Sequence, residues 1–315
     1  MQWSHIKTLF ILSFLVLNIY LLFQFVQRQD QYDLPSLSSD DPTLDEELES
    51  ENIQIDDAIL NREVPDLSYL SVAQRLFKSS EVEELNSIDG VEATMSLDKT
   101  LLFAQFEEPI EMPEEGAERE MLQSIVAPYV IQAGQYTYGT WNKDLNIIAF
   151  FQTKEGAPLF LNQQAILLLY LNDDNEITHY TQTMLGDHEK QGDRSIVSPK
   201  TAIGYLLRSN NSSYLRQDQE VSEIDIGYYS RIDPEDGGEI VFAPTWKVTI
   251  EDTVDYFVNG FEGIIYPGDY TKFFTDTINE NILVQARRLD EENEIRENII
   301  QLMEGKLEEI GSEDE

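Results

Sequence analysis

Few side chains in this sequence could carry out covalent chemistry. The 315-residue chain has no cysteine, which excludes a disulfide framework, a thiolate nucleophile and a cysteine-based metal site. Of its 3 histidines, His179 and His188 fall outside the H-x-x-x-H and H-E-x-x-H spacings that hold zinc. His179 lies in a predicted strand without the partners that orient a catalytic base, so we interpret it as a packed residue.

Carboxylates are abundant, and two segments contain enough of them to suggest calcium loops. These segments are residues 173–176 and 233–239, and both lack the full D-x-D-x-D-G-x5-E pattern of a calcium-binding loop. Ordinary hairpin turns explain their composition better. The nucleophile motif G-x-S-x-G and the phosphate-binding motifs G-x-x-x-x-G-K-[ST] and G-x-G-x-x-G are also missing. We therefore predict a protein that is not an enzyme and that uses no metal or cofactor.

The overall charge is strongly negative. Sixty Asp and Glu residues against 21 Lys and Arg residues give a formal net charge of -39. Such a surface repels nucleic acid and anionic lipid headgroups, so we exclude nucleic acid as a partner. The acidity either keeps an exposed surface soluble or attracts cations and basic proteins, and composition leaves both alternatives open.

Residues 8–27 form an apolar segment without Asp, Glu, Lys or Arg. Twenty helical residues span about 30 Å, which is the thickness of a bilayer's hydrocarbon core. The segment is too long for a signal-peptide core, and no small-x-small cleavage site follows it. We predict a single uncleaved transmembrane helix. Lys7 and Arg28 on its two sides leave its orientation nearly undecided by charge alone.

Three polar residues interrupt this predicted span: Ser13, Asn18 and Gln24. An amide in hydrocarbon is costly unless it finds a hydrogen-bond partner, so these residues are candidate contacts with partner helices. The alternative is that water defects and backbone bonds accommodate Asn18 without a partner.

The remaining chain divides by composition. Pro, Ser and a run of acidic residues mark a solvated linker after the predicted span. The predicted ranges are a short N-terminus (1–7), the transmembrane helix (8–27), an acidic linker (28–51), a first α+β domain (52–133), a second α+β domain (134–285) and an acidic amphipathic helix or tail (286–315).

Apolar periodicity predicts mostly strands in the two domains. We expect helices over residues 81–87, capped by Ser79 or Ser80, and over 119–132 and 198–208. The expected strands are residues 69–77, 91–95, 100–106, 136–141, 145–153, 158–161, 165–171, 176–185, 220–231, 239–250 and 256–265. This order predicts an α+β fold, with two small domains of antiparallel sheet and helices packed on one face. A partly frayed helix closes the chain, with a docking helix as the alternative.

Several motifs follow one another along the chain: the N-terminal segment from Trp3 through LFILSFLVLNIYLLFQF, GQYTY at 134–138, the strand end FQ at 151–152, GAPLFLN at 156–162, YTQT at 180–183, SPKTAI at 198–203, GYY at 227–229, FAPTWKV at 242–248 and YFVNGFEG at 256–263. Taken in this order, the motifs resemble the WalI (YycI) family of membrane-anchored regulators. Within the last three, we expect Tyr228 and Trp246 to pack in the core, Pro244 to mark an edge or bulge, Asn259 to bond backbone, and Gly263 to mark a turn or bulge.

This resemblance implies a location and a set of partners. The protein would sit in the cell membrane with its N-terminus in the cytoplasm and its bulk outside. It would pair with a WalH (YycH)-like protein and act on the WalK sensor histidine kinase, largely through transmembrane helices. The result would be control of cell-wall metabolism genes, with either sign of regulation. The rival function is an extracytoplasmic module that senses a cell-wall fragment or a cation, which requires a deep pocket with convergent polar groups.

Overall fold

The computed structural model describes residues 3–32, 43–112, 124–192, 194–209, 214–231 and 238–313. The chain forms two compact units. Unit 1 comprises Met1–Gln54 with Arg216–Gln219, and unit 2 comprises Ile55–Leu215 with Glu220–Glu315.

Unit 1 begins with the long helix α1 (Trp3–Tyr32). This helix includes the whole predicted span 8–27 and continues on both sides of it. The side chains from Phe10 to Leu22 are exposed along its length. Among the residues whose placement the structure gives, no helix combines the length and the apolar run that crossing a membrane requires. The transmembrane span therefore stays a prediction.

The second helix of unit 1, α2 (Leu44–Ser50), lies within the stretch that we expected to be a solvated linker. A capping box begins it: the backbone N–H of Glu46 donates to Thr43 Oγ1 over 3.3 Å, and the N–H of Thr43 donates to Glu46 Oε2 over 2.8 Å. These bonds satisfy two of the N–H groups that a helix start leaves free. After α2 the chain reaches the short strand β1 (Gln54–Ile55), and Asn52 Nδ2 bonds Asp218 Oδ1 at 2.8 Å.

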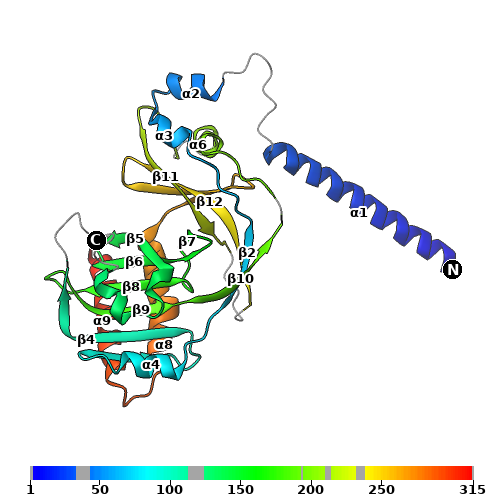
Figure 1. The fold of residues 1–315 in the computed structure, drawn as a ribbon. Coiled ribbons are helices and arrows are strands. Elements are labelled where there is room, and N and C mark those ends of the chain that lie inside the picture. Colours follow the sequence, from blue (N-terminus) through cyan, green and yellow to red (C-terminus); the bar gives the residue numbers. More distant parts are fainter. Residues whose placement is uncertain are drawn as a thin grey trace. The chain divides into compact units, whose positions relative to one another are not determined.

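The strands of unit 2 form one continuous, mainly antiparallel sheet (Figure 1), which we describe as two parts joined by β7. We call sheet I the strands β10-β2-β12-β11, with β13 and β14 added beyond part of β12, and sheet II the strands β5-β6-β8-β9-β4-β3. The bounds are β2 (Tyr69–Gln74), β3 (Val91–Met95), β4 (Leu101–Glu111), β5 (Tyr136–Asn142), β6 (Ile147–Lys154), β7 (Ala157–Phe160), β8 (Ile166–Leu171), β9 (Glu176–Thr183), β10 (Leu185–Gln191), β11 (Glu220–Tyr229), β12 (Ile240–Ile250), β13 (Val254–Asn259) and β14 (Ile265–Pro267).

Strand β7 joins the two sheets. It pairs in parallel with β11, where Tyr228 faces Leu159 and Tyr229 faces Phe160. It also pairs antiparallel with β6, where Thr153 faces Pro158. The predicted boundary between residues 133 and 134 falls inside unit 2, because β4 on one side of it pairs with β9 on the other. The α+β class with a mainly antiparallel sheet is confirmed.

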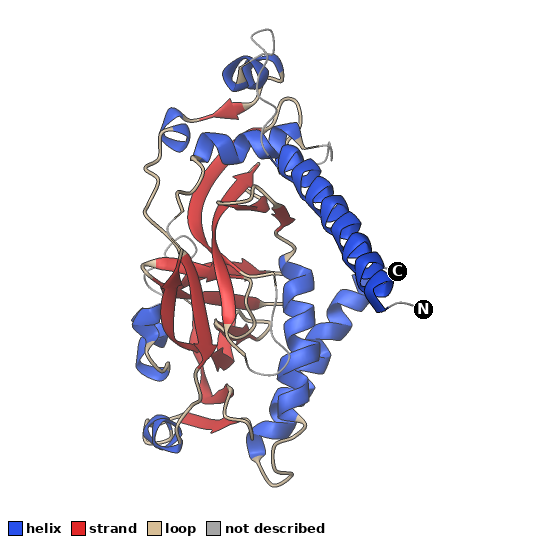
Figure 2. Ribbon diagram, turned by 90° about the vertical axis from the view of Figure 1, so that its right-hand side faces the viewer, coloured by secondary structure: helices blue, strands red, loops and turns tan. Residues whose placement is uncertain are grey.

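Helices cover both faces of sheet II (Figure 2). The helical segments of unit 2 are α3 (Asp57–Leu60), α4 (Ser79–Leu85), η1 (Ala127–Tyr129), η2 (Ala133–Gln135), α6 (Pro199–Arg208), α7 (Tyr270–Asp276), the π-helical turn η3 (Thr277–Ile282), α8 (Leu283–Ala286) and α9 (Glu294–Glu313). One face, with Leu101 and Phe103 of β4, packs against α7, η3, α8 and α9. The other face, with Leu102 and Ala104, packs against α4. The prediction of helices on one face is wrong here. Successive residues of these strands point to opposite faces of the sheet, and both sets are apolar, so both faces need a cover.

Two predicted helices need correction. Helix α4 begins after Lys78, whose side chain makes no cap bond, instead of after Ser79 or Ser80. The helix expected over residues 119–132 falls partly on 113–123, outside the described residues. Residues 124–126 are helical, and beyond Val126 the backbone breaks into the short 3-10 turns η1 and η2, with Pro128 inside η1 and Gln132 at a φ of 52°. A proline inside the segment removes a helical N–H and ends the regular helix.

The C-terminal helix α9 is docked on sheet II. Ile295, Ile299 and Met303 on one face are buried in the core that the strands form. Lys306 is also buried, and its Nζ donates to Leu145 O over 2.7 Å and to Leu171 O over 3.2 Å. The expected frayed helix is therefore an integral part of unit 2, and the docking alternative describes it better.

Candidate functional site

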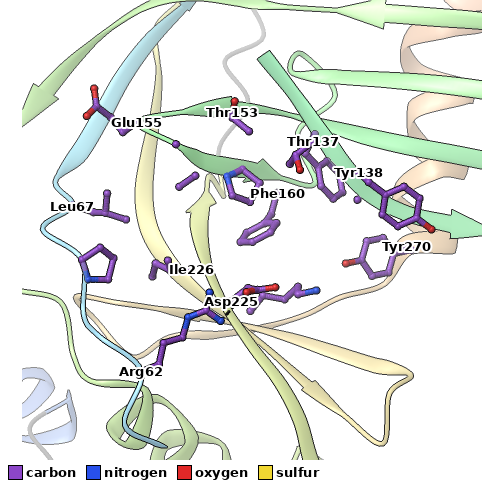
Figure 3. A pocket seen from close by; sticks show the side chains of 17 residues that line it. Arg62, Leu67, Thr137, Tyr138, Thr153, Glu155, Phe160, Asp225, Ile226 and Tyr270 are labelled. Atoms are coloured by element: carbon purple, nitrogen blue, oxygen red, sulfur yellow. Dashed lines mark ion pairs between the residues drawn. The ribbon is translucent and has the colours of Figure 1, made fainter. Parts of the chain in front are cut away.

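A cleft of about 510 Å³ opens between sheet I and sheet II in unit 2 (Figure 3). Strand β5 supplies one wall with Thr137 and Tyr138, and the turn that joins β6 to β7 supplies another with Glu155. Opposite them lie Asp225 of β11 and Arg62, which follows α3. The cleft thus collects side chains from four segments that are far apart in the sequence.

The shape of the cleft depends on a close approach at Gly139 of β5. A Cβ added there would lie 2.5 Å from the Phe151 ring and 3.0 Å from Ala149 O. The register of β5 against β6 also shifts between Tyr138 and Thr140. A glycine lets β5 fold onto the Phe151 ring here, and a larger residue would push the strand outward.

Charged groups of the cleft form ion pairs on one wall and along the rim. Arg62 Nη1 lies 2.8 Å from Asp225 Oδ1. At the rim, Glu155 accepts from Lys190 Nζ over 2.7 Å and bonds His188 Nε2 at 2.6 Å. These hydrogen bonds, from Lys190 first and then His188, hold the pKa of Glu155 below its ordinary value. The carboxylate therefore stays charged across the neutral range.

The inner end of the cleft holds Lys247 and Tyr270. Lys247 Nζ lies 3.6 Å from Glu223 Oε2 and 3.9 Å from Asp255 Oδ2, and 15% of its side chain is exposed. Tyr270 Oη donates to Asp255 Oδ2 over 2.6 Å. Burial, and then the charge of Asp255, raises the pKa of Tyr270 well above its ordinary value. The phenol therefore stays protonated and acts as a hydrogen-bond donor.

The floor of the cleft is apolar. The rings of Phe151 and Phe160 meet edge to face at 6.2 Å, and Leu67 and Ile226 lie beside them. An apolar floor with a few fixed polar groups is the usual composition of a small-molecule site. The arrangement can bind and orient a ligand, and nothing in its geometry positions a nucleophile beside a base.

The five motif residues lie in or beside sheet I, and Asn259 lines a second cavity. Tyr228 and Trp246 are fully buried, and Trp246 Nε1 donates to Val197 O over 2.9 Å. Pro244 of β12 faces Tyr228 in the ladder. Gly263 turns with a φ of 66°, and a Cβ there would meet the Tyr205 ring at 2.7 Å.

The three polar residues of α1 divide between two sides of the helix. Gln24 follows Ser13 by about three helical turns, which places the two within about 20° of each other around the axis. Asn18 lies about 140° from Ser13 by the same geometry. All three side chains are exposed in unit 1. They could therefore contact two different neighbours, but not one neighbour together.

His179, the other histidine considered for a site, has little access to solvent. His179 of β9 lies under α9, and burial together with the charge of Lys306 lowers its pKa to about 4. Its Nδ1 contacts only the neighbouring Thr178 Oγ1, at 3.0 Å. Across the described ranges, no group of three or more His, Asp or Glu side chains is placed to hold a metal ion. At the first calcium candidate, Asn172 Oδ1 accepts from the N–H groups of Asp174 and Glu176, as in a hairpin turn.

Comparison with known families decides the relationship of this chain. The family model described as "YycI protein" matches residues 31–261, which is more than half of the chain. The chain belongs to the YycI family. This confirms the resemblance read from the motifs of the sequence, and membership suggests a role in the WalK–WalR system.

Two other comparisons add little. No curated protein matches the chain. Among solved structures, an uncharacterized protein from Eubacterium rectale is 12% identical, covers 64% of this chain and 86% of its own, and gives a TM-score of 0.40. The Bacillus megaterium YpeB C-terminal domain is 11% identical, covers 61% and 98%, and gives a TM-score of 0.36.

Proposed function

We propose that this protein is a membrane-anchored, non-enzymatic regulator of the WalK sensor histidine kinase, acting together with a WalH (YycH)-like protein to control cell-wall metabolism. The observation that carries the proposal is the family match over residues 31–261. The charge-free sequence of residues 8–27 supports the anchor. In this proposal the N-terminus is cytoplasmic and unit 2 lies outside the cell.

The mechanism would act through helix placement. The output of a sensor kinase depends on how its transmembrane helices are arranged, and a neighbouring helix that binds one arrangement better increases its population. On α1, Asn18 faces one neighbour while Ser13 and Gln24 face another. One helix could thus contact the kinase and the WalH-like protein at the same time.

Co-purification tests this proposal with the full-length chain. Asn18→Leu should weaken recovery of WalK about threefold, because an interhelical hydrogen bond of this kind is worth roughly 0.6 kcal/mol. Ile19→Leu, one residue along the same helix, is the matched control and should leave recovery unchanged. Unchanged recovery and signalling in the Asn18→Leu variant would remove the helix contact from the proposal.

A second experiment separates the two interfaces. Residues 1–28 are exchanged for an unrelated anchor, and both partners are assayed in the same pull-down. Loss of WalK with retention of the WalH-like protein is expected if the kinase contact lies in the membrane and the other contact outside it. Retention of WalK would contradict the membrane contact.

The cleft favours a second candidate function, an extracytoplasmic sensor of a cell-wall fragment or a cation. Its convergent side chains, among them Arg62, Asp225 and Tyr270, are the feature that this function requires. A ligand that binds the folded state raises the unfolding temperature. Titration with muropeptides and with Ca²⁺ tests the function, and no rise with either would argue against it.

A further inference from the structure

A second cavity in unit 2, of about 350 Å³, lies on sheet I and is lined by tyrosines. We call it the tyrosine cavity and define it by Tyr69, Tyr229, Tyr266 and Asn259, with Glu262 and Arg231 at its rim. Its volume lies within the range of small-ligand sites, about 300 to 1,000 Å³. It is separate from the cleft, with which it shares no lining residue.

The aromatic wall is built as a stack. The Tyr229 ring stacks on Phe257 at 5.7 Å and 13°, and on Tyr266 at 4.9 Å and 30°. Across the cavity, the Tyr69 ring packs against Phe261 at 4.7 Å. Neighbouring rings fix one another, so the cavity presents rigid aromatic surface with little entropy left to lose when a ligand binds.

Asn259 supplies a fixed donor to this cavity. The residue is 7% exposed, and its Oδ1 accepts from the N–H groups of Phe261 and Glu262, both over 2.9 Å. These two bonds fix the amide plane and direct Nδ2 away from the turn, toward the cavity that Asn259 lines. The structure gives Nδ2 no hydrogen bond to another described residue, so this donor is free to bond an acceptor on a ligand in the cavity.

The rim adds acceptors and a donor. Glu239 accepts from Ser71 Oγ, which holds its carboxylate at the cavity. Burial raises the pKa of Tyr69 and the charge of Glu262 raises it further, so the Tyr69 hydroxyl stays protonated and can both donate and accept. Arg231 sets a positive charge beside the two carboxylates. The cavity therefore offers aromatic faces together with donors and acceptors, without a strong excess of either charge.

We propose that the tyrosine cavity binds a saccharide of one or two rings, with the ring face on the tyrosines and a hydroxyl or acetamido oxygen accepting from Asn259 Nδ2. A pyranose ring has a C–H face that packs on an aromatic ring and an edge of hydroxyls that both donate and accept. This combination matches the wall and the rim of the cavity.

The cavity fits other occupants less well. A peptide strand would have to pair with β14, the strand that carries Tyr266, but β14 has three residues and ends in Pro267. Such a short edge offers few N–H groups for strand addition. An organic cation would gain from the tyrosines and the two carboxylates, but it has no acceptor for the Nδ2 donor of Asn259.

Titration of the full-length chain tests the proposal, in a detergent whose headgroup is not a sugar. The probes are N,N′-diacetylchitobiose, cellobiose and, for the cation alternative, tetramethylammonium. We expect at least one disaccharide to bind, measured by calorimetry and by saturation transfer from protein to ligand in NMR. No binding of either disaccharide, or binding of tetramethylammonium alone, would overturn the proposal.

Variants of the cavity residues then test whether the ligand binds in the tyrosine cavity. Asn259→Asp keeps an oxygen for the two turn bonds and removes the donor, so binding should weaken about fivefold. Tyr266→Leu removes part of the aromatic wall and should weaken binding about as much. Tyr214→Leu is the control, since Tyr214 pairs with Tyr256 at 5.1 Å outside the cavity, and should bind as the wild type does. If Asn259→Asp unfolds, Tyr266→Leu decides. If Asn259→Asp and Tyr266→Leu fold and bind the disaccharide with wild-type affinity, the ligand binds elsewhere on the protein.

Discussion

Lys306 should be among the residues of α9 on which stability depends most. Its ammonium is buried between α9 and sheet II, and it donates to Leu145 O over 2.7 Å and to Leu171 O over 3.2 Å, with Asn146 O at 3.5 Å. Lys306→Met keeps most of the aliphatic stem but leaves these carbonyl groups without that donor.

The size of the loss follows from the two shorter bonds. A hydrogen bond from a charged donor contributes about 1.5 kcal/mol or more, so the two together give about 3 kcal/mol. The third distance is too long to add much. For a unit of this size, about 3 kcal/mol lowers the unfolding temperature by roughly 6 to 12 °C.

Thermal and urea unfolding of the full-length chain, followed by tryptophan fluorescence, measures this loss. The matched control is Lys272→Met, because Lys272 is also helical but its side chain is 68% exposed in an ion pair with Asp276. The control should change stability by less than about 0.5 kcal/mol. Equal stability of the two variants would show that the buried ammonium does not hold α9 to the sheet.

Two further predictions concern His179 and Gly227. The pKa of His179 is lowered from 6.5 to about 4 in the folded protein. Between these two pH values the unfolded chain binds a proton at His179 and the folded chain does not. Its contribution to stability is present above about pH 6.5 and is lost as the pH falls to about 4, by up to about 3 kcal/mol; His179→Gln should flatten that part of the unfolding profile relative to the wild type, and identical slopes would contradict the assignment. Gly227→Ala should destabilise unit 2 by about 2 kcal/mol or more, because the new Cβ would meet the Phe160 ring and lie 2.6 Å from Pro158 O. Urea unfolding measures it, and a midpoint equal to that of the wild type would show that β7 moves aside at little cost.

Local signals in the sequence predicted most strands and one helix well. Helix α6 begins where expected because Ser198 Oγ accepts from the N–H of Thr201 over 3.2 Å and Pro199 takes the first helical position. Strand β3 has the predicted bounds, and β4 begins one residue later than predicted but runs on to Glu111. These elements follow from neighbours in sequence, which is why pattern alone finds them.

The segment from α7 to α8 was missed although a signal was present. Phe274, Ile278, Ile282 and Ala286 recur at every fourth residue and are all buried, and Asp269 caps the start by accepting from the N–H of Lys272 over 2.9 Å. A spacing of four keeps side chains on one helical face. Attention to this spacing would have predicted the helix.

The cleft could not have been predicted in the same way. Its Arg62–Asp225 pair joins residues far apart in the sequence, and their meeting depends on how β11 pairs with β7 and β12. In a chain with 60 acidic residues, no single carboxylate stands out as the partner of Arg62. Lys306 is similar: its acidic, amphipathic helix suggests a solvated lysine, and only the docked position of α9 buries it.

The docking of α9 also sets a limit on when the protein can fold. Leu101 and Phe103 of β4 share one apolar core with Ile299 and Met303 of α9, so this core stays incomplete until α9 has been synthesised. Until α9 packs against them, the strands synthesised earlier expose one apolar face, and such exposed faces are prone to aggregation. The long delay between synthesis of β4 and synthesis of α9 makes this chain a strong candidate for help from a chaperone before it reaches its final form.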